Sequence, residues 1–170
     1  YLAVDLAKEV GSDLILGTDP DSDRVGVMVR GADGEYHTIT GNQMGVLLLD
    51  YIITARRRKG TLPENAAAIS TIVTSKMVRR ICDVNDIHFD ETFTGFKFMA
   101  EKLAEYQRDG SYQYVLAFEE SYGYMMGDYV RDKDAVTACV MITEMAAYYF
   151  EQGMTLAQAL DALYEKYGFY

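Results

Sequence analysis

The chain of 170 residues carries 26 acidic and 16 basic side chains and a formal net charge of −10. Proteins bind nucleic-acid backbones through basic stripes, so this charge argues against a nucleic-acid partner. The composition, 49% hydrophobic and 25% charged, is that of an ordinary globular protein. The most apolar stretch, residues 135–150, is interrupted by Glu144 and is shorter than the ~20 residues that span a bilayer. We therefore expect no membrane partner.

The chain begins with Tyr1 rather than Met, and its first residues lack the order of a signal peptide. Residues 2–10 instead have the pattern of a helix. Cys82 and Cys139 lie far apart within apolar segments, which favours free thiols in a reducing compartment over a metal or redox pair. We expect a piece of a longer cytoplasmic polypeptide.

The first predicted elements surround an acidic loop. Short apolar runs at residues 13–18 and 25–29 indicate two strands, and residues 35–40 indicate a third. A helix follows over residues 42–58 and ends at Gly60, and its last turn holds the basic residues 56–59, which complement the helix dipole. We place a domain boundary near Gly41.

From Gly60 onward, strands and helices alternate, which is typical of an α/β layer with a largely parallel sheet. Strands are expected at 66–73, 87–92 and 114–118, and helices at 75–84, 95–107, 134–151 and 156–167. Ser75 and Thr155 are the expected caps of two of these helices. The predicted fold is α/β, with a mixed, largely parallel sheet flanked by helices in residues 41–170 and a partial preceding α/β domain in residues 1–40.

The acidic loop places Asp19, Asp21 and Asp23 at alternate positions between two strands. Three like charges this close are costly unless a cation neutralises them, and carboxylate oxygens suit Mg²⁺. An EF-hand is excluded, because Arg24 and Arg30 stand where that loop needs glycine and glutamate. Judged without its neighbours, the loop is equally well explained as an acidic turn. Arg24 favours a metal-binding, functional loop over a plain acidic turn, because a metal beside a guanidinium suits phosphoryl transfer.

Two later loops also carry polar groups. Residues 92–98 follow a predicted strand and open a helix whose first turn holds Lys97, a cation that the helix dipole opposes unless an anion binds. A surface lysine is the more ordinary interpretation of this loop alone. Residues 118–123 follow another strand, and there Glu119 and Ser121 are suited to sugar hydroxyls, although an exposed acidic turn explains them equally well. Arg131 and Lys133 then precede the long helix, where the helix dipole opposes cations, so a phosphate or a neighbouring carboxylate should compensate their charge.

Taken together and in order, these segments resemble the α-D-phosphohexomutase superfamily. They are Thr-Asp-Pro-Asp-Ser-Asp-Arg at 18–24, Thr-Gly-Asn-Gln at 40–43, Thr-Gly-Phe-Lys-Phe at 94–98, Phe-Glu-Glu-Ser-Tyr-Gly-Tyr at 118–124 and Val-Arg-Asp-Lys-Asp-Ala at 130–135. The likeness is greatest to bacterial α-phosphoglucomutases and the related phosphopentomutases. It covers nearly the whole chain, from late in the family's second domain through its third.

The resemblance implies a role for each matching residue. Asp19, Asp21 and Asp23 would hold one Mg²⁺, with a phosphoserine from the first domain as the fourth ligand. Arg24 and Lys133 would serve catalysis beside the transferring phosphoryl group. The residues implied in substrate binding are Thr94, Gly95, Lys97, Glu119, Ser121 and Arg131.

The implied reaction is a reversible transfer between C1 and C6 of a hexose phosphate through a phosphoserine and a bisphosphate, with glucose 1,6-bisphosphate as primer. No serine in this chain is followed by His-Asn-Pro, as the family's catalytic serine usually is. We therefore expect domains 1 and 4 to belong to the same polypeptide and this chain alone to be inactive. Phosphomannomutase and phosphopentomutase substrates stay open, as does a non-catalytic module that binds metal or sugar.

Overall fold

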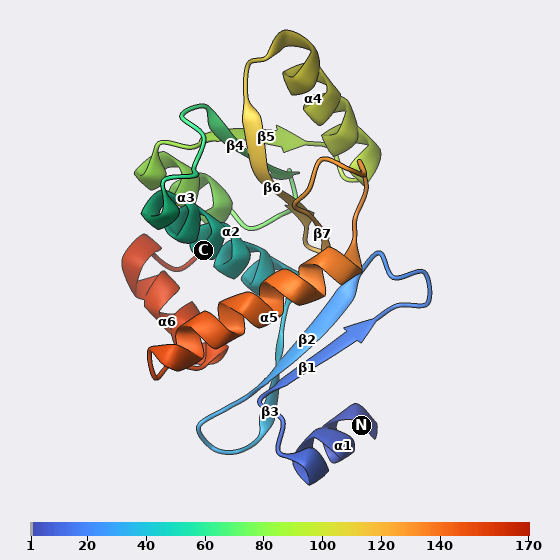
Figure 1. The fold of residues 1–170 in the computed structure, drawn as a ribbon, viewed down its shortest axis with the longest axis vertical. Helices are drawn as coiled ribbons and strands as arrows, with labels where there is room; N and C mark the ends of the chain where they lie inside the picture. Colours follow the sequence, from blue (N-terminus) through green and yellow to red (C-terminus); the bar gives the residue numbers. More distant parts are fainter. Residues whose placement is uncertain (1) are drawn as a thin grey trace.

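The computed structural model describes residues 2–170 (Figure 1). Helix α1, Leu2–Val10, is followed by an antiparallel sheet in the order β1-β2-β3, formed by Leu14–Thr18, Val25–Arg30 and Tyr36–Ile39. Alternate residues of β2, Val25, Val27 and Val29, are buried, because one face of this sheet packs against helix α5, Ala135–Glu151. The four predicted elements of this region are confirmed.

A second sheet has the order β5-β4-β6-β7. Its central strand β4, Ala66–Thr71, pairs in parallel with β5, His88–Thr92, and with β6, Gln113–Glu119. The edge strand β7, Gly123–Met125, pairs antiparallel with β6. The sheet is therefore mixed and largely parallel, as predicted. Strand β7 is not among the predicted strands, because the sequence pattern indicates only a loop at residues 118–123.

Helices cover both faces of this sheet. Alternation along β4 sends Ala66 and Ala68 into the core shared with the helices α2, Gly41–Lys59, α3, Met77–Asn85, α5 and α6, Leu156–Tyr167. Ala67 and Ile69 of the same strand face helix α4, Phe96–Asp109, on the other side. All six residues of β4 are buried, as expected for a central parallel strand.

Local capping chemistry sets the helix ends. Two helices begin with a capping box. In α2 it joins Thr40 and Gln43, and in α6 it joins Thr155 and Gln158. Gly60 closes α2 with φ of 68°, a left-handed conformation that favours glycine. The predicted cap at Ser75 is wrong by one residue: the N-cap of α3 is Lys76, which makes no side-chain cap bond, and the Ser75 hydroxyl accepts the Met77 N–H at 3.3 Å from the position before it.

The predicted domain boundary near Gly41 falls between β3 and α2. One apolar core nevertheless runs across that position, because β2 and Ile39 share it with α2 and α5. The division into residues 1–40 and 41–170 stays a prediction. Within residues 2–170, no helix is both long and apolar enough to cross a membrane.

Candidate metal and substrate site

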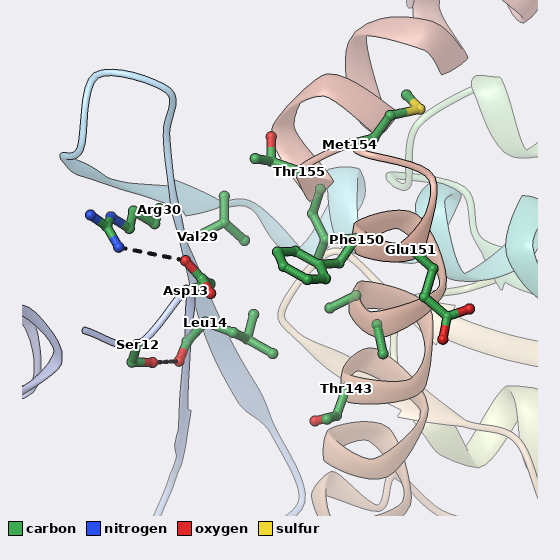
Figure 2. A pocket seen from close by; sticks show the side chains of 13 residues that line it. Ser12, Asp13, Leu14, Val29, Arg30, Thr143, Phe150, Glu151, Met154 and Thr155 are labelled. Atoms are coloured by element: carbon green, nitrogen blue, oxygen red, sulfur yellow. Dashed lines mark hydrogen bonds and ion pairs between the residues drawn. The ribbon is translucent and has the colours of Figure 1, made fainter. Parts of the chain in front are cut away.

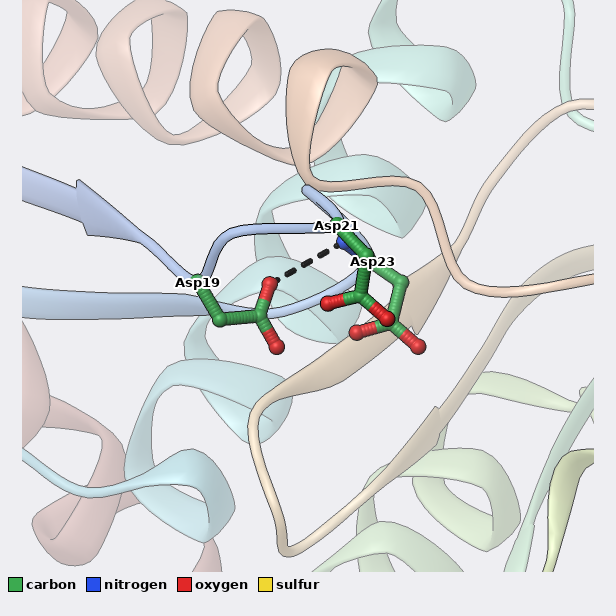
Figure 3. Close-up of side chains that lie close together, drawn as sticks. All are labelled: Asp19, Asp21 and Asp23. Atoms are coloured by element: carbon green, nitrogen blue, oxygen red, sulfur yellow. Dashed lines mark hydrogen bonds between the residues drawn. The ribbon is translucent and has the colours of Figure 1, made fainter.

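The acidic loop closes the hairpin between β1 and β2, whose last pair is Thr18 with Val25. Asp19 shapes the loop, because its Oδ1 accepts the backbone N–H groups of Asp23 and Arg24, each at 3.2 Å. The three carboxylates then converge: one oxygen from each of Asp19, Asp21 and Asp23 lies within 4.8 Å of the other two (Figure 3). The sequence-predicted metal ligands are thus brought together.

Two cations lie against this cluster. The Arg24 Nε donates to Asp19 Oδ2 at 2.9 Å, and Lys133 Nζ lies 3.0 Å from Asp23 Oδ2. Desolvation raises the pKa of Asp19, but the hydrogen bonds from the backbone and side chain of Arg24 outweigh it and lower the pKa to about 2. Asp19 is therefore ionised at any ordinary pH, as a metal ligand must be.

One oxygen of the cluster receives no hydrogen bond. Asp23 Oδ1 is buried and, among the described residues, accepts none, although the Arg24 Nε lies 3.5 Å away. Burying such an oxygen is costly, and a bound cation removes that cost. Three convergent carboxylates, one of them with a buried oxygen that accepts no hydrogen bond, fit Mg²⁺, which takes hard oxygen ligands and keeps several waters. The residues present therefore suit the implied metal.

Main-chain hydrogen bonds hold the acidic loop against the second sheet. The first N–H of α5, from Ala135, donates to Ser22 O at 3.0 Å, and Val25 N–H donates to Tyr122 O at 3.2 Å. Arg24 also forms an isolated antiparallel bridge with Gly123. These contacts place the acidic loop beside the β6–β7 loop, so segments about a hundred residues apart share one site.

The β6–β7 loop carries the predicted sugar-binding residues. Glu119, the last residue of β6, is only 7% exposed. Ser121 and Tyr122 line a cleft of about 310 Å³ whose other wall includes Asp19 and Arg24. One predicted metal ligand, Asp19, and one predicted hydroxyl-binding residue, Ser121, therefore border the same opening, at the carboxyl end of a parallel strand.

Lys133 reaches the acidic loop across β7. A Cβ on Gly123 would lie 2.1 Å from Lys133 Cδ, so glycine is needed there for the lysine to pass. The ammonium lies 4.9 Å from the centre of the Phe96 ring. Burial opposes its charge, but the hydrogen bond to Asp23 and the neighbouring carboxylates raise the pKa of Lys133 above its usual value. Lys133 is therefore a cation at neutral pH.

The other predicted site residues are not joined to this cluster. Gly95 has φ of 118°, which favours glycine, and Thr94 beside it is exposed. Lys97 Nζ lies 4.7 Å from the centre of the Phe98 ring, and Arg131 donates to Gln107 of α4 at 2.5 Å. Within residues 2–170, no ion pair links Lys97 or Arg131 to the acidic loop. Their roles stay predictions.

Sequence reasoning missed Tyr122, Gly123 and Phe96 as parts of this site. Tyr122 contributes its carbonyl oxygen, Gly123 its lack of a side chain and Phe96 its ring. Gly123 was the one residue with a usable signal, since a glycine in a strand often marks close approach of another group.

A larger cavity, of about 610 Å³, lies elsewhere (Figure 2). Leu14, Val29 and Arg30 of the first sheet line one side, and Phe150 of α5 and Met154 of the turn between α5 and α6 line the other. Its lining is mostly apolar, and Arg30 is already paired with Asp13 at 3.7 Å. Convergent carboxylates are absent from its lining, so the smaller cleft at the acidic loop is the candidate site.

Fold and site together define an α/β protein with a carboxylate cluster at the carboxyl end of a largely parallel sheet. Comparison with known families assigns it further: "Phosphoglucomutase/phosphomannomutase, alpha/beta/alpha domain III" matches residues 40–167. The chain belongs to the phosphoglucomutase/phosphomannomutase family, in agreement with the resemblance that its sequence motifs indicate.

Individual relatives agree. A phosphoglucomutase of Staphylococcus aureus is 37% identical over 166 residues, which are 98% of this chain and 29% of that protein. A putative phosphomannomutase from Thermus thermophilus superposes with a TM-score of 0.73 at 21% identity, over 97% of this chain and 34% of that one. An Aspergillus fumigatus N-acetylphosphoglucosamine mutase, solved with GlcNAc-6P and magnesium, superposes with a TM-score of 0.64 at 13% identity, over 95% of this chain and 39% of that one. The chain thus spans about a third or less of these first two relatives.

Proposed function

We propose that this chain supplies the metal loop and the sugar loop of a phosphohexomutase that transfers a phosphoryl group reversibly between C1 and C6 of a hexose phosphate. The observation that carries the proposal is the cleft in which Asp19 and Arg24 face Ser121. The phosphoserine that donates and accepts the phosphoryl group would lie outside residues 1–170, in keeping with the greater length of the relatives.

Asp19, Asp21 and Asp23 would hold one Mg²⁺, through one oxygen each. When bound, the metal would stabilise negative charge on the phosphoryl group during transfer. Bound magnesium in the Aspergillus mutase supports this proposal. The buried Oδ1 of Asp23 also supports it, because this oxygen accepts no hydrogen bond and only the Arg24 guanidinium, at 3.5 Å, compensates its charge.

The two cations at the cluster have separate tasks in this proposal. Arg24, whose Nε is held by Asp19, would keep its remaining N–H groups for phosphoryl oxygens. Lys133 would neutralise charge that develops beside Asp23 and is close enough to Glu119 for their charges to interact. Both act as fixed positive groups and need no proton transfer of their own.

The substrate's sugar would be held by Glu119 and Ser121, which accept and donate hydrogen bonds to vicinal hydroxyls. Thr94, Gly95 and Lys97 would form a second contact, and Arg131 a third, each on the sugar or its other phosphate. A bisphosphate that turns round must bind in two orientations, and hydroxyls common to both poses allow this. Glucose 1,6-bisphosphate is the expected primer.

A phosphopentomutase of the same superfamily is the alternative substrate assignment, and a non-catalytic metal- or sugar-binding module is the alternative function. The test is a mutase assay of the whole polypeptide that contains this chain, with glucose, mannose and pentose 1-phosphates compared. We expect turnover of a hexose phosphate that requires Mg²⁺ and that Glu119→Ala lowers in kcat/KM by roughly 10- to 100-fold, the size of a hydrogen bond to a charged acceptor. Turnover of the pentose alone would favour the phosphopentomutase, and no turnover of any sugar would favour the module.

A further inference from the structure

The β6–β7 loop adopts a conformation that its own sequence does not favour. Because Glu119 pairs with Gly123, only three residues make the turn, and the last of them, Tyr122, has φ of 69°. An aromatic side chain rarely adopts this left-handed conformation. Contacts outside the loop must therefore hold it in place.

The side chain of Glu120 makes such a contact. Its Oε2 accepts the hydroxyl of Thr71 at 3.0 Å and that of Thr74 at 3.4 Å. The two hydroxyls are buried at the end of β4, lie 2.8 Å apart, and are joined to the backbone by the Thr71 N–H, which donates to Thr74 Oγ1. Glu120 therefore reaches across the sheet to β4, while Ser121, the next residue, lines the cleft.

The backbone of Glu120 also packs closely, against the first residue of α2. A Cβ on Gly41, at the start of α2, would lie 2.0 Å from Glu120 O and 2.9 Å from Tyr122 N. On the far side of the loop, Tyr122 O accepts the Val25 N–H next to the acidic loop. The β6–β7 loop therefore packs against β4 and α2 on one side. On the other side, its Tyr122 carbonyl oxygen accepts a hydrogen bond next to the acidic loop.

We propose that Glu120 is a positioning residue: its bonds to Thr71 and Thr74 fix the three-residue turn so that Ser121 and Tyr122 stay aligned with the acidic loop. Glu120 itself touches neither the cleft nor the carboxylate cluster. The part of this inference that concerns sugar affinity rests on the proposed function. The part that concerns the alignment of the two loops does not.

The test compares Glu120→Ala and Glu120→Gln with the unaltered chain, and uses Glu64→Ala as a matched control. Glu64 is an exposed glutamate just before the opposite end of β4. The measurement is hydrogen exchange of single amides by NMR. Loss of two accepted hydroxyl bonds in Glu120→Ala should speed exchange of the Val25 amide about tenfold or more. Glu120→Gln keeps an acceptor oxygen, so it should restore most of the protection, and the control should leave it unchanged.

If Glu120 only stabilised the fold as a whole, the exchange pattern would differ. The substitution would then speed exchange evenly over β2, β4 and β6, and this result, or an unchanged Val25 amide in Glu120→Ala, would overturn the proposal. If Glu120→Ala does not fold, Thr71→Val removes the hydroxyl that donates to Glu120 at 3.0 Å and keeps a β-branched side chain, and the same local acceleration at Val25 decides the question.

A second arm separates this proposal from the proposed function. Glucose 1-phosphate is titrated into each variant and followed through the Ser121 amide resonance. We expect a weak response in the unaltered chain that is weaker again in Glu120→Ala and largely rescued in Glu120→Gln. A chain that does not respond to the sugar phosphate, yet shows the local exchange effect, would overturn the sugar-binding role of this loop and leave Glu120 as its positioning residue.

Discussion

Lys133 and Asp23 form an ion pair of 3.0 Å that joins the segment before α5 to the acidic loop. The second oxygen of the same aspartate is buried, accepts no hydrogen bond and lies 3.5 Å from the Arg24 Nε. The lysine therefore compensates only part of the charge at this cluster. A metal that binds here must share Asp23 with an ammonium ion already in place.

The first prediction is that the chain binds Mg²⁺ weakly, with a dissociation constant of the order of millimolar, and that Asp21→Ala abolishes binding. Few protein oxygens are available, so waters must complete the coordination. Asp21 is exposed, whereas Asp19 also holds the loop backbone, so Asp21→Ala tests the metal site without unfolding the loop. Calorimetry at millimolar Mg²⁺ is the measurement. The control is Asp161→Ala, an exposed aspartate on α6. Binding that survives Asp21→Ala would put the metal elsewhere.

The second prediction is that Lys133→Met tightens Mg²⁺ binding by about tenfold, equivalent to ~1.4 kcal/mol, because the ammonium that competes for Asp23 is gone. Methionine keeps most of the apolar stem against Phe96 and Gly123. The same calorimetric titration measures the effect, with Lys8→Met, at an exposed lysine of α1, as the control. Weaker binding in Lys133→Met would mean that the lysine organises the carboxylates rather than competing for them.

The strands and helices were largely predictable because their signals are local. Thr40 with Gln43 and Thr155 with Gln158 mark two helix starts, and both capping boxes are present. Strand β7 had no such signal. It has three residues, and the turn before it puts Tyr122 in a left-handed conformation, where a glycine or asparagine would have revealed a hairpin.

The candidate site was predictable only in part, for a related reason. Asp19, Asp21 and Asp23 are near one another in sequence, so their spacing alone predicts the cluster. The pairing of Lys133 with Asp23 depends on how α5 packs against the first sheet, and no spacing encodes that contact. Sequence patterns of this kind report neighbours along the chain, whereas the partner of a buried charge is set by tertiary packing.

The third prediction concerns the buried carboxylate of Asp50, which is 8% exposed on α2. Its Oδ1 accepts hydrogen bonds from Lys166 Nζ at 2.9 Å and from the hydroxyl of Tyr167 at 2.5 Å. Tyr167→Phe removes the second donor and should lower the free energy of unfolding by about 1–2 kcal/mol, which corresponds to roughly 2–8 °C in Tm. Urea unfolding followed by circular dichroism measures it. Tyr170→Phe at the exposed chain end is the control and should have no effect. Equal stability of the two variants would show that this network contributes little.

The fourth prediction is that Cys82 is inert in the folded chain. Burial, with a smaller contribution from Asp83, raises the pKa of its thiol to about 12, so at pH 8 only about one thiol in 10⁴ is the reactive thiolate. A disulfide reagent applied to the Cys139→Ser variant should therefore react with Cys82 only after urea unfolding. Because the pKa is raised, increasing the pH from 7 to 9 should leave the folded thiol unreactive. Fast reaction at pH 8 without urea would contradict the buried position.

The last prediction is that the 170-residue chain has no mutase activity alone. Transfer between two positions of a sugar through the enzyme needs a covalent phosphoryl carrier, and no serine of the chain stands in the sequence context that the family's catalytic serine has. Ser121 is the serine that must be tested as a phosphoryl carrier, because it lines the cleft beside Asp19 and Arg24. A hydroxyl becomes a nucleophile only when a base takes its proton, and two carboxylates of the cluster are already committed to cations: Asp19 binds Arg24, and Asp23 binds Lys133. Charge stabilisation by a metal and a guanidinium cannot replace a phosphoryl donor held in line.

The assay is conversion of glucose 1-phosphate to glucose 6-phosphate, with Mg²⁺, glucose 1,6-bisphosphate as primer and the chain at high concentration. We expect no turnover above a control without protein. Turnover that Asp21→Ala abolishes would show that the chain holds a complete active site, and loss of that turnover in Ser121→Ala would identify its phosphoryl carrier. Because Ser121→Ala leaves the backbone of the β6–β7 loop in place, the Val25 amide should stay protected in this variant, which separates loss of a nucleophile from loss of the turn.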